Sequence, residues 1–170
     1  MPSFSPAGDG SLQHNGQVLP PQESPPSTSV TGLATWQVEA LQKLTHTAPL
    51  LVTDDDLMSR RFYRALLADT CGLTLIETGD PTEALKICQA QAVSLVISCI
   101  IKPTRMDGLK LVSDLRASAE TRAIPLMIVT AALNTRELAF EAGADAYLSK
   151  PCHPNEILQE IWRLLRSRAL

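Results

Sequence analysis

The sequence has few aromatic residues, no long apolar run and no basic residue near its start, and each lack excludes a class of protein. Aromatic residues make up only 4% of the 170 residues, so a core must consist mostly of Leu, Ile, Val and Ala, which the 45% apolar content allows. No stretch approaches the roughly 18 apolar residues that cross a bilayer. The first Lys or Arg is Lys43, so the basic region of a signal peptide is missing. We therefore expect a cytoplasmic protein with no membrane partner.

The net charge and the spacing of the histidines and cysteines predict neither a nucleic-acid partner nor a zinc site. The formal net charge is -3, which provides no basic patch for nucleic acid. The three histidines are scattered and the four cysteines follow no C-x-x-C pattern, so neither set predicts a zinc site. In a cytoplasmic chain we expect reduced thiols. The cysteines are Cys71, Cys88, Cys99 and Cys152.

The N-terminal residues 1–32 differ in composition from the rest of the chain. They hold six of the twelve prolines, and their only charged residues are Asp9 and Glu23. Such a segment cannot bury enough apolar surface to offset the entropy lost on ordering. We therefore expect a disordered tail.

A short amphipathic helix or linker is expected over 33–47. Leu33, Trp36, Leu41 and Leu44 recur at helical spacing, and Thr31 is a candidate N-cap. Such a stripe favours a helix that packs on its own domain. The alternative is a docking or dimerisation helix with Trp36 as its anchor.

From residue 48 to 168, short apolar runs alternate with helical patterns. The pattern predicts an α/β domain of (βα)5 type. Strands this apolar are buried on both faces, which indicates a doubly wound parallel sheet in the order 2-1-3-4-5. The last helix carries an apolar stripe at Ile157, Ile161, Leu164 and Leu165, and Gly143 is a candidate helix C-cap. The expected strands are 50–53, 73–78, 94–98, 125–129 and 146–149, and the expected helices are 57–69, 82–90, 108–118, 135–142 and 154–168.

Polar residues follow these predicted strands at their carboxyl ends. In such a sheet the binding site lies at that edge, beside the switch in winding direction. Carboxylates there suit a hard cation, while a hydroxyl and an ammonium group suit phosphoryl oxygens. The residues are Asp54, Asp55, Asp56, Cys99, Thr130 and Lys150.

Together these motifs resemble the receiver domain of two-component response regulators. The resemblance rests on LLVTDDDLMSRR, PTRMDGLKLV, PLMIVTA and EAGADAYLSKP, in this order over 48–166. It implies a flavodoxin-like receiver fold. It also implies that Asp54 and Asp55 form the Mg²⁺-binding pair, that Thr130 is the switch hydroxyl, that Tyr147 is the aromatic residue moving with it, and that Lys150 contacts the phosphoryl group.

One residue departs from the family pattern at its reacting position. By the resemblance, Cys99 stands where the family has its phosphoacceptor aspartate. A thiol cannot form the acyl phosphate and is a soft ligand that Mg²⁺ disfavours, so we expect no cofactor and at most weak Mg²⁺ binding. The loop from Pro103 to Asp107 is also longer, and the interval from Thr130 to Gly143 shorter, than usual.

The leading hypothesis is a stand-alone pseudo-receiver that acts as a phosphorylation-independent protein-interaction module and not as an enzyme. Lys150 would pair directly with the acidic residues in place of a metal. Another signalling protein would bind the face formed by 135–168, with Tyr147, Ile157 and Trp162, or the N-terminal helix. A homodimer through these surfaces is a further expectation.

Other functions remain open at this point. Cys99 could be a thiol redox switch, with Cys152 as a resolving thiol. The chain could be a receiver phosphorylated at an unconventional residue. A haloacid-dehalogenase-like phosphohydrolase would use the Asp54-x-Asp56 spacing, but the cap insertion of that family is missing.

Overall fold

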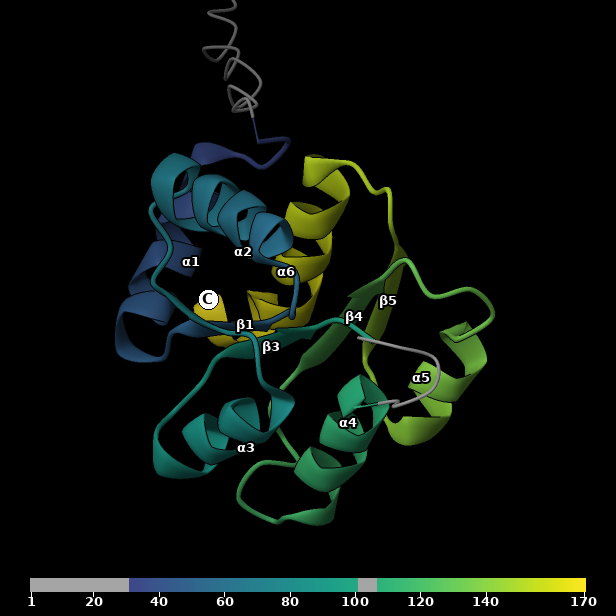
Figure 1. Ribbon diagram of the computed structural model, residues 1–170. Helices are drawn as coiled ribbons and strands as arrows, with labels where there is room; N and C mark the ends of the chain where they lie inside the picture. The colour runs from purple at the N-terminus through teal and green to yellow at the C-terminus, as the bar shows by residue number, and fades with distance from the viewer. Residues whose placement is uncertain (1–30, 101–106) are drawn as a thin grey trace, which may run out of the picture.

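A five-stranded parallel sheet forms the centre of the molecule (Figure 1). The computed structural model describes residues 31–100 and 107–170. The strand order β2-β1-β3-β4-β5 confirms the predicted doubly wound topology. Most of the expected tail and the loop 103–106 lie outside the described residues. The strands are β1 (Leu50–Thr53), β2 (Leu75–Thr78), β3 (Leu95–Ser98), β4 (Leu126–Thr130) and β5 (Ala146–Ser149).

Helices cover both faces of this sheet, as Figure 1 shows. One layer contains α1 (Thr35–Thr47), α2 (Leu57–Tyr63) with its π-helical continuation η1 (Arg64–Thr70), and α6 (Pro154–Ala169). The other contains α3 (Pro81–Ala90), α4 (Asp107–Ala117) and α5 (Arg136–Ala142).

Alternate strand residues supply two separate hydrophobic cores. Leu50 and Val52 of β1 face the core beneath α1, α2 and α6, whereas Leu51 between them faces the other core. All three are fully buried. This is the burial on both faces that the continuous apolar runs predict.

Local sequence signals explain most helix boundaries. Asp56 and Asp80 accept hydrogen bonds from the first backbone N–H groups of α2 and α3, as N-cap residues do. Gly143 ends α5 in the left-handed region at φ 108°, which confirms it as the C-cap. The expected helix 57–69 is divided into α2 and η1, a change to wider turns that side-chain periodicity does not reveal.

Helix α1 is packed against the domain. It begins after Ala34, so the prediction of Thr31 as N-cap is wrong; the backbone N–H of Ala34 instead donates to the Gln37 side chain. Leu41 is buried in the core. The Gln42 amide donates to the Cys71 carbonyl at 2.7 Å. The Trp36 ring meets Trp162 of α6 edge to face, with centroids 5.3 Å apart.

None of the helices in the described ranges 31–100 and 107–170 has both the length and the apolar character needed to cross a membrane.

Candidate functional site

The strand ends expected to carry the site open into one cleft of about 650 Å³. Its lining includes most of the candidate residues, which come from the ends of β1, β3, β4 and β5. The structure therefore brings together side chains that are far apart in the sequence. They are Asp54, Asp55, Asp56, Cys99, Thr130 and Lys150.

Lys150 and Asp54 form an ion pair at the centre of this cleft. The Lys150 Nζ lies 2.7 Å from Asp54 Oδ2, and the Asp54 carboxylate is only 2% exposed. Asp54 Oδ1 accepts the backbone N–H of Asp56 at 3.0 Å, so both carboxylate oxygens are in use. Burial alone would lower the pKa of Lys150, but the hydrogen bond and charge of Asp54 outweigh it and raise that pKa. Lys150 is therefore protonated at neutral pH.

Ser59 was not identified as a site residue from the sequence. Its hydroxyl accepts from Lys150 Nζ at 2.9 Å and donates to Asp56 at 2.8 Å. Asp56 is the N-cap of α2 and accepts the backbone N–H of Ser59, so the sequence signal at this position predicts a local helix cap and not the contact with Lys150. Ser59 thus links the lysine to the first turn of α2.

The three consecutive aspartates have different surroundings. Asp56 is exposed and caps α2, and its hydrogen bonds with the Ser59 side chain and the backbone N–H groups of Ser59 and Met58 lower its pKa. Asp55 is also exposed, whereas Asp54 is buried. This division disfavours the phosphohydrolase hypothesis, since Asp56 serves the helix terminus.

Cys99 directly follows β3 and lies beside Thr130. Its backbone N–H donates to the Thr53 carbonyl, and its Sγ lies 3.8 Å from Thr130 Oγ1. Burial, followed by the charge of Asp54, raises the pKa of the thiol, so the thiol is protonated at neutral pH. A methyl group at Gly108 would lie 2.3 Å from the Cys99 carbonyl oxygen, so only glycine allows α4 to begin this close to the strand end.

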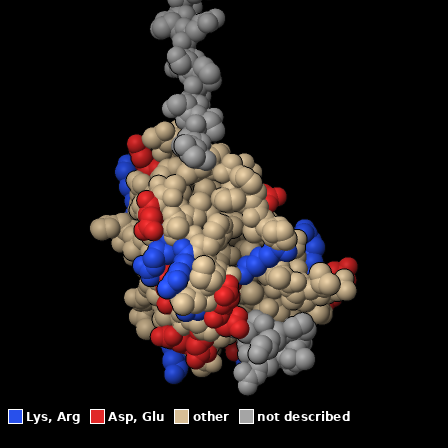
Figure 2. All heavy atoms as spheres, turned by 45° about the horizontal axis from the view of Figure 1, so that its top comes forward, with Lys and Arg blue, Asp and Glu red and all other residues tan. Residues whose placement is uncertain are grey.

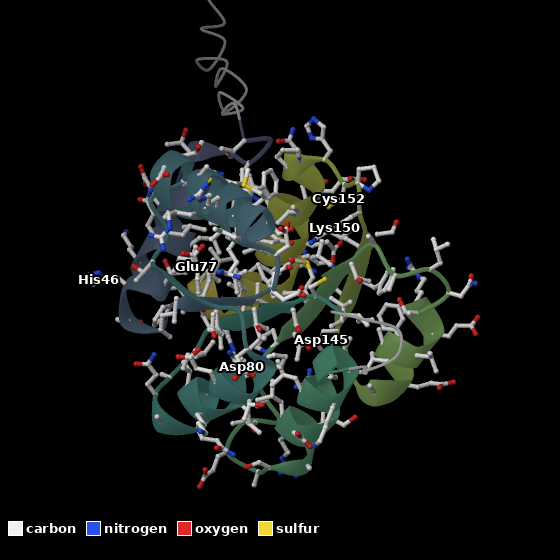
Figure 3. All side chains as sticks on the ribbon, viewed as in Figure 1. His46, Glu77, Asp80, Asp145, Lys150 and Cys152 are labelled. Atoms are coloured by element: carbon white, nitrogen blue, oxygen red, sulfur yellow. The ribbon has the colours of Figure 1, made fainter. Side chains whose placement is uncertain are left out.

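Cys152, the candidate resolving thiol, is partly buried two residues after Lys150 (Figure 3). Burial, followed by the charge of Glu156, raises its pKa. Thiol exchange requires the thiolate. Two protonated thiols therefore disfavour the redox-switch hypothesis.

Thr130 and Tyr147 are bonded to the segment between β4 and α5. The buried Thr130 hydroxyl accepts the Ala132 N–H at 3.1 Å. The Tyr147 hydroxyl lies 3.1 Å from the Thr135 hydroxyl and donates to the Ala132 carbonyl at 3.4 Å. These contacts tie both expected switch residues to the same short loop.

The donor set at the cleft does not fit a magnesium site. Mg²⁺ requires near-octahedral oxygen coordination, but Lys150 occupies one Asp54 oxygen and the strand β3 position offers a thiol. Within the described part of the chain, no three His, Cys, Asp or Glu side chains are grouped to hold a metal ion. Figure 3 places His46 at the left edge of the molecule, apart from Lys150.

The expected interaction face needs correction. Ile157 is fully buried in the core, so it cannot contact a partner. Trp162 is partly covered by Trp36 of α1. Apolar side chains are instead exposed on and just before α5: Leu133 is 85% exposed, and Leu138 and Phe140 are each 42% exposed. Tyr147 lies next to them, with the Arg136 guanidinium 5.7 Å from its ring centroid.

A parallel sheet with an acidic residue, a hydroxyl and a lysine at its carboxyl edge defines a signalling domain of the receiver class. Residues 50–162 match the response regulator receiver domain family. The chain belongs to this family, which operates in two-component signalling.

Known proteins support the same assignment. The chain is 35% identical over 121 residues to the response regulator Rre1 of Synechocystis sp., covering 70% of this chain and 52% of that protein. It is 32% identical over 122 residues to the cyclic di-GMP phosphodiesterase response regulator RpfG of Xanthomonas campestris pv. campestris, covering 70% and 32%. The chain thus spans only a third to a half of these relatives. The chemotaxis response regulator CheY4 of Vibrio cholerae superposes with a TM-score of 0.62 at 26% identity, covering 70% of this chain and 99% of that one.

Proposed function

We propose that this receiver domain is a pseudo-receiver: a module that binds another signalling protein without being phosphorylated and has no catalytic activity of its own. The observation that carries the proposal is the Lys150–Asp54 pair at 2.7 Å beside the protonated thiol of Cys99. Receiver chemistry needs a carboxylate nucleophile and a cation. Here the cleft offers a thiol, and an ammonium group neutralises the buried carboxylate.

The interaction surface in this proposal is the outer side of α5 and β5. Leu133, Leu138 and Phe140 are exposed there, and Arg136 lies over the rings of Phe140 and Tyr147. Exposed apolar side chains grouped with an arginine and a tyrosine are typical of protein interfaces. The exposed part of α1 around Trp36 is a second contact surface, and a homodimer through either surface is an alternative to a foreign partner.

Incubation with acetyl phosphate and Mg²⁺, followed by intact-mass measurement, tests the missing phosphorylation. The wild-type protein is expected to keep its mass, while a phosphorylatable receiver treated in parallel gains one phosphoryl group. The Cys99→Asp variant asks whether a carboxylate at this position is enough to regain the modification. Addition of a phosphoryl group to any residue of the wild type would contradict the proposal and favour phosphorylation at an unconventional residue.

A further inference from the structure

A second depression lies next to the acidic cleft and has a different character. It is a groove of about 330 Å³ between α2 and the segment that joins β5 to α6. We call it the α2 groove. Asp56, Ser59 and Lys150 line it on the side shared with the cleft. The rest of the lining is largely apolar: Met58, Phe62, Tyr63, Val129, Pro151, Cys152 and Ile157.

The rim of the α2 groove exposes large apolar side chains. Met58 is 64% exposed and Phe62, one helical turn later, is 41% exposed. Figure 2, which turns this helix layer toward the viewer, shows a broad uncharged area with the charged groups mainly around its margins. Grouped apolar exposure of this kind marks a binding surface.

The chain enters the fold close to this groove. A methyl group at Gly32 would lie 3.0 Å from Asn155 in the first turn of α6, directly after the Pro151–Cys152 wall of the groove. Leu33 is already buried in the core. The thirty residues that precede Thr31 are therefore tethered beside the α2 groove.

One stretch of that segment matches the groove chemically. Residues 18–26 read VLPPQESPP, with two apolar residues, four prolines and a single charge at Glu23. Proline-rich segments lose little entropy on binding and dock in grooves that present an aromatic ring, and Phe62 supplies the exposed ring here. The four residues 27–30 can bridge roughly 13 Å when extended.

We propose that residues 18–26 bind in the α2 groove of the same chain. The tether gives the segment an effective concentration in the millimolar range (about 1 mM or more), an advantage that neither a second copy nor a foreign peptide shares. The bound segment covers Met58 and Phe62, the exposed apolar side chains at the rim of the groove. The domain then carries its own cover for one surface and leaves the α5 surface open.

Site-specific photo-crosslinking in the full chain tests this placement. Phe62 is replaced by p-benzoylphenylalanine, and Phe140 is replaced in the same way as a matched control, because the two rings are 41% and 42% exposed on different helices. The Phe62 probe is expected to crosslink to residues 18–26 within a monomer, and the Phe140 probe is not. Covalent dimers at Phe62 would show that a second copy occupies the groove. Equal labelling from both probes, or none from Phe62, would overturn the proposal.

Hydrogen exchange provides an independent measurement without a probe in the groove. In the full chain, Met58→Asp is expected to raise exchange at the Val18 and Leu19 amides about tenfold, because the docked state is lost. Leu138→Asp, an equally drastic change on α5, is expected to leave these rates unchanged. Rates that are the same in the wild type and in both variants would contradict the docked state. Neither result depends on whether Cys99 can be phosphorylated, so this proposal and the pseudo-receiver proposal can fail separately.

Discussion

The cleft that contains Asp54 and Lys150 differs from the outer surface of α5 in its contacts. The polar groups of the cleft are bonded within the domain, whereas the apolar side chains on α5 are exposed. In the cleft, Lys150 bonds to both Asp54 and Ser59, and Thr130 bonds to the loop beside it. On α5, Leu138 and Phe140 are exposed to solvent. Internal bonds make the cleft residues part of the structure, whereas exposed apolar groups gain by binding something else. This difference supports the proposal that the domain acts through contact rather than through chemistry at its cleft.

Removal of the Lys150 charge should have the largest effect on this comparison. Lys150→Met leaves the buried Asp54 carboxylate unpaired, which we expect to lower the free energy of unfolding by about 3 kcal/mol. Lys110→Met is the control, because Lys110 pairs with Asp114 at the surface and should cost less than about 0.5 kcal/mol. Urea denaturation measures both. Equal losses would show that the cleft pair is no more structural than a surface pair.

Removal of the Thr130 hydroxyl should have a smaller effect. Thr130→Val leaves the Ala132 N–H without its acceptor, and we expect a loss of about 1–2 kcal/mol in the free energy of unfolding. Thr47→Val removes an exposed hydroxyl that donates to the Leu44 carbonyl and should cost less. If the order were reversed, the cleft hydroxyl would be free for another role.

Changes on the α5 surface should leave stability nearly intact. Leu133→Ser is expected to change the free energy of unfolding by no more than about 0.5 kcal/mol, because this side chain is 85% exposed. Thermal and urea unfolding are the measurements. A loss as large as that of Lys150→Met would mean that this surface is required by the fold and would remove its role as a free contact.

The smallest expected effect is the change in stability at alkaline pH that comes from ionisation of Cys99. Burial and Asp54 raise the pKa of Cys99 above its ordinary value of 9.0 in the folded state. A group with a raised pKa stabilises the fold fully below its unfolded pKa and loses that contribution as the pH rises through the folded value. The stability difference between wild type and Cys99→Ser should therefore be constant from neutral pH to 9.0 and shrink above it. Melting temperatures across this range measure it, and a change between pH 6 and 8 would mean that the thiol ionises early.

The sheet could be predicted from the sequence because strands that are buried on both faces appear as short, continuous apolar runs. The expected strands 50–53 and 146–149 agree with β1 and β5. The wide turns of η1 could not be predicted, since η1 keeps its apolar side chains at spacings that a regular helix would also use. With Cys99 in place of a carboxylate, we expected Lys150 to pair directly with the acidic residues. The structure confirms this pair and shows that Asp54 is the partner.

The sequence-based predictions were wrong or incomplete for side chains on helices, whose burial and contacts depend on how the helices pack. Ile157 belongs to the same stripe as Ile161 and Leu165, and all three are buried, so the stripe itself argued against placing Ile157 on an interface. The partial covering of Trp162 could not be seen in the sequence, because it depends on how α1 lies against α6. Ser59 was missed since a serine at a helix start predicts local capping and not a contact with a residue 91 positions away.

The position of α1 determines where this protein can safely be cut. The family match begins at Leu50, three residues after α1 ends at Thr47. A fragment trimmed to that boundary would lose Leu41 from the core, together with the Gln42 bond to Cys71 and the Thr45 hydroxyl that accepts the Thr74 N–H. Truncations that aim at the isolated domain should therefore start no later than Thr31. A start at Leu50 would remove α1 and expose the apolar surface of α6 that α1 covers, and such a surface promotes aggregation.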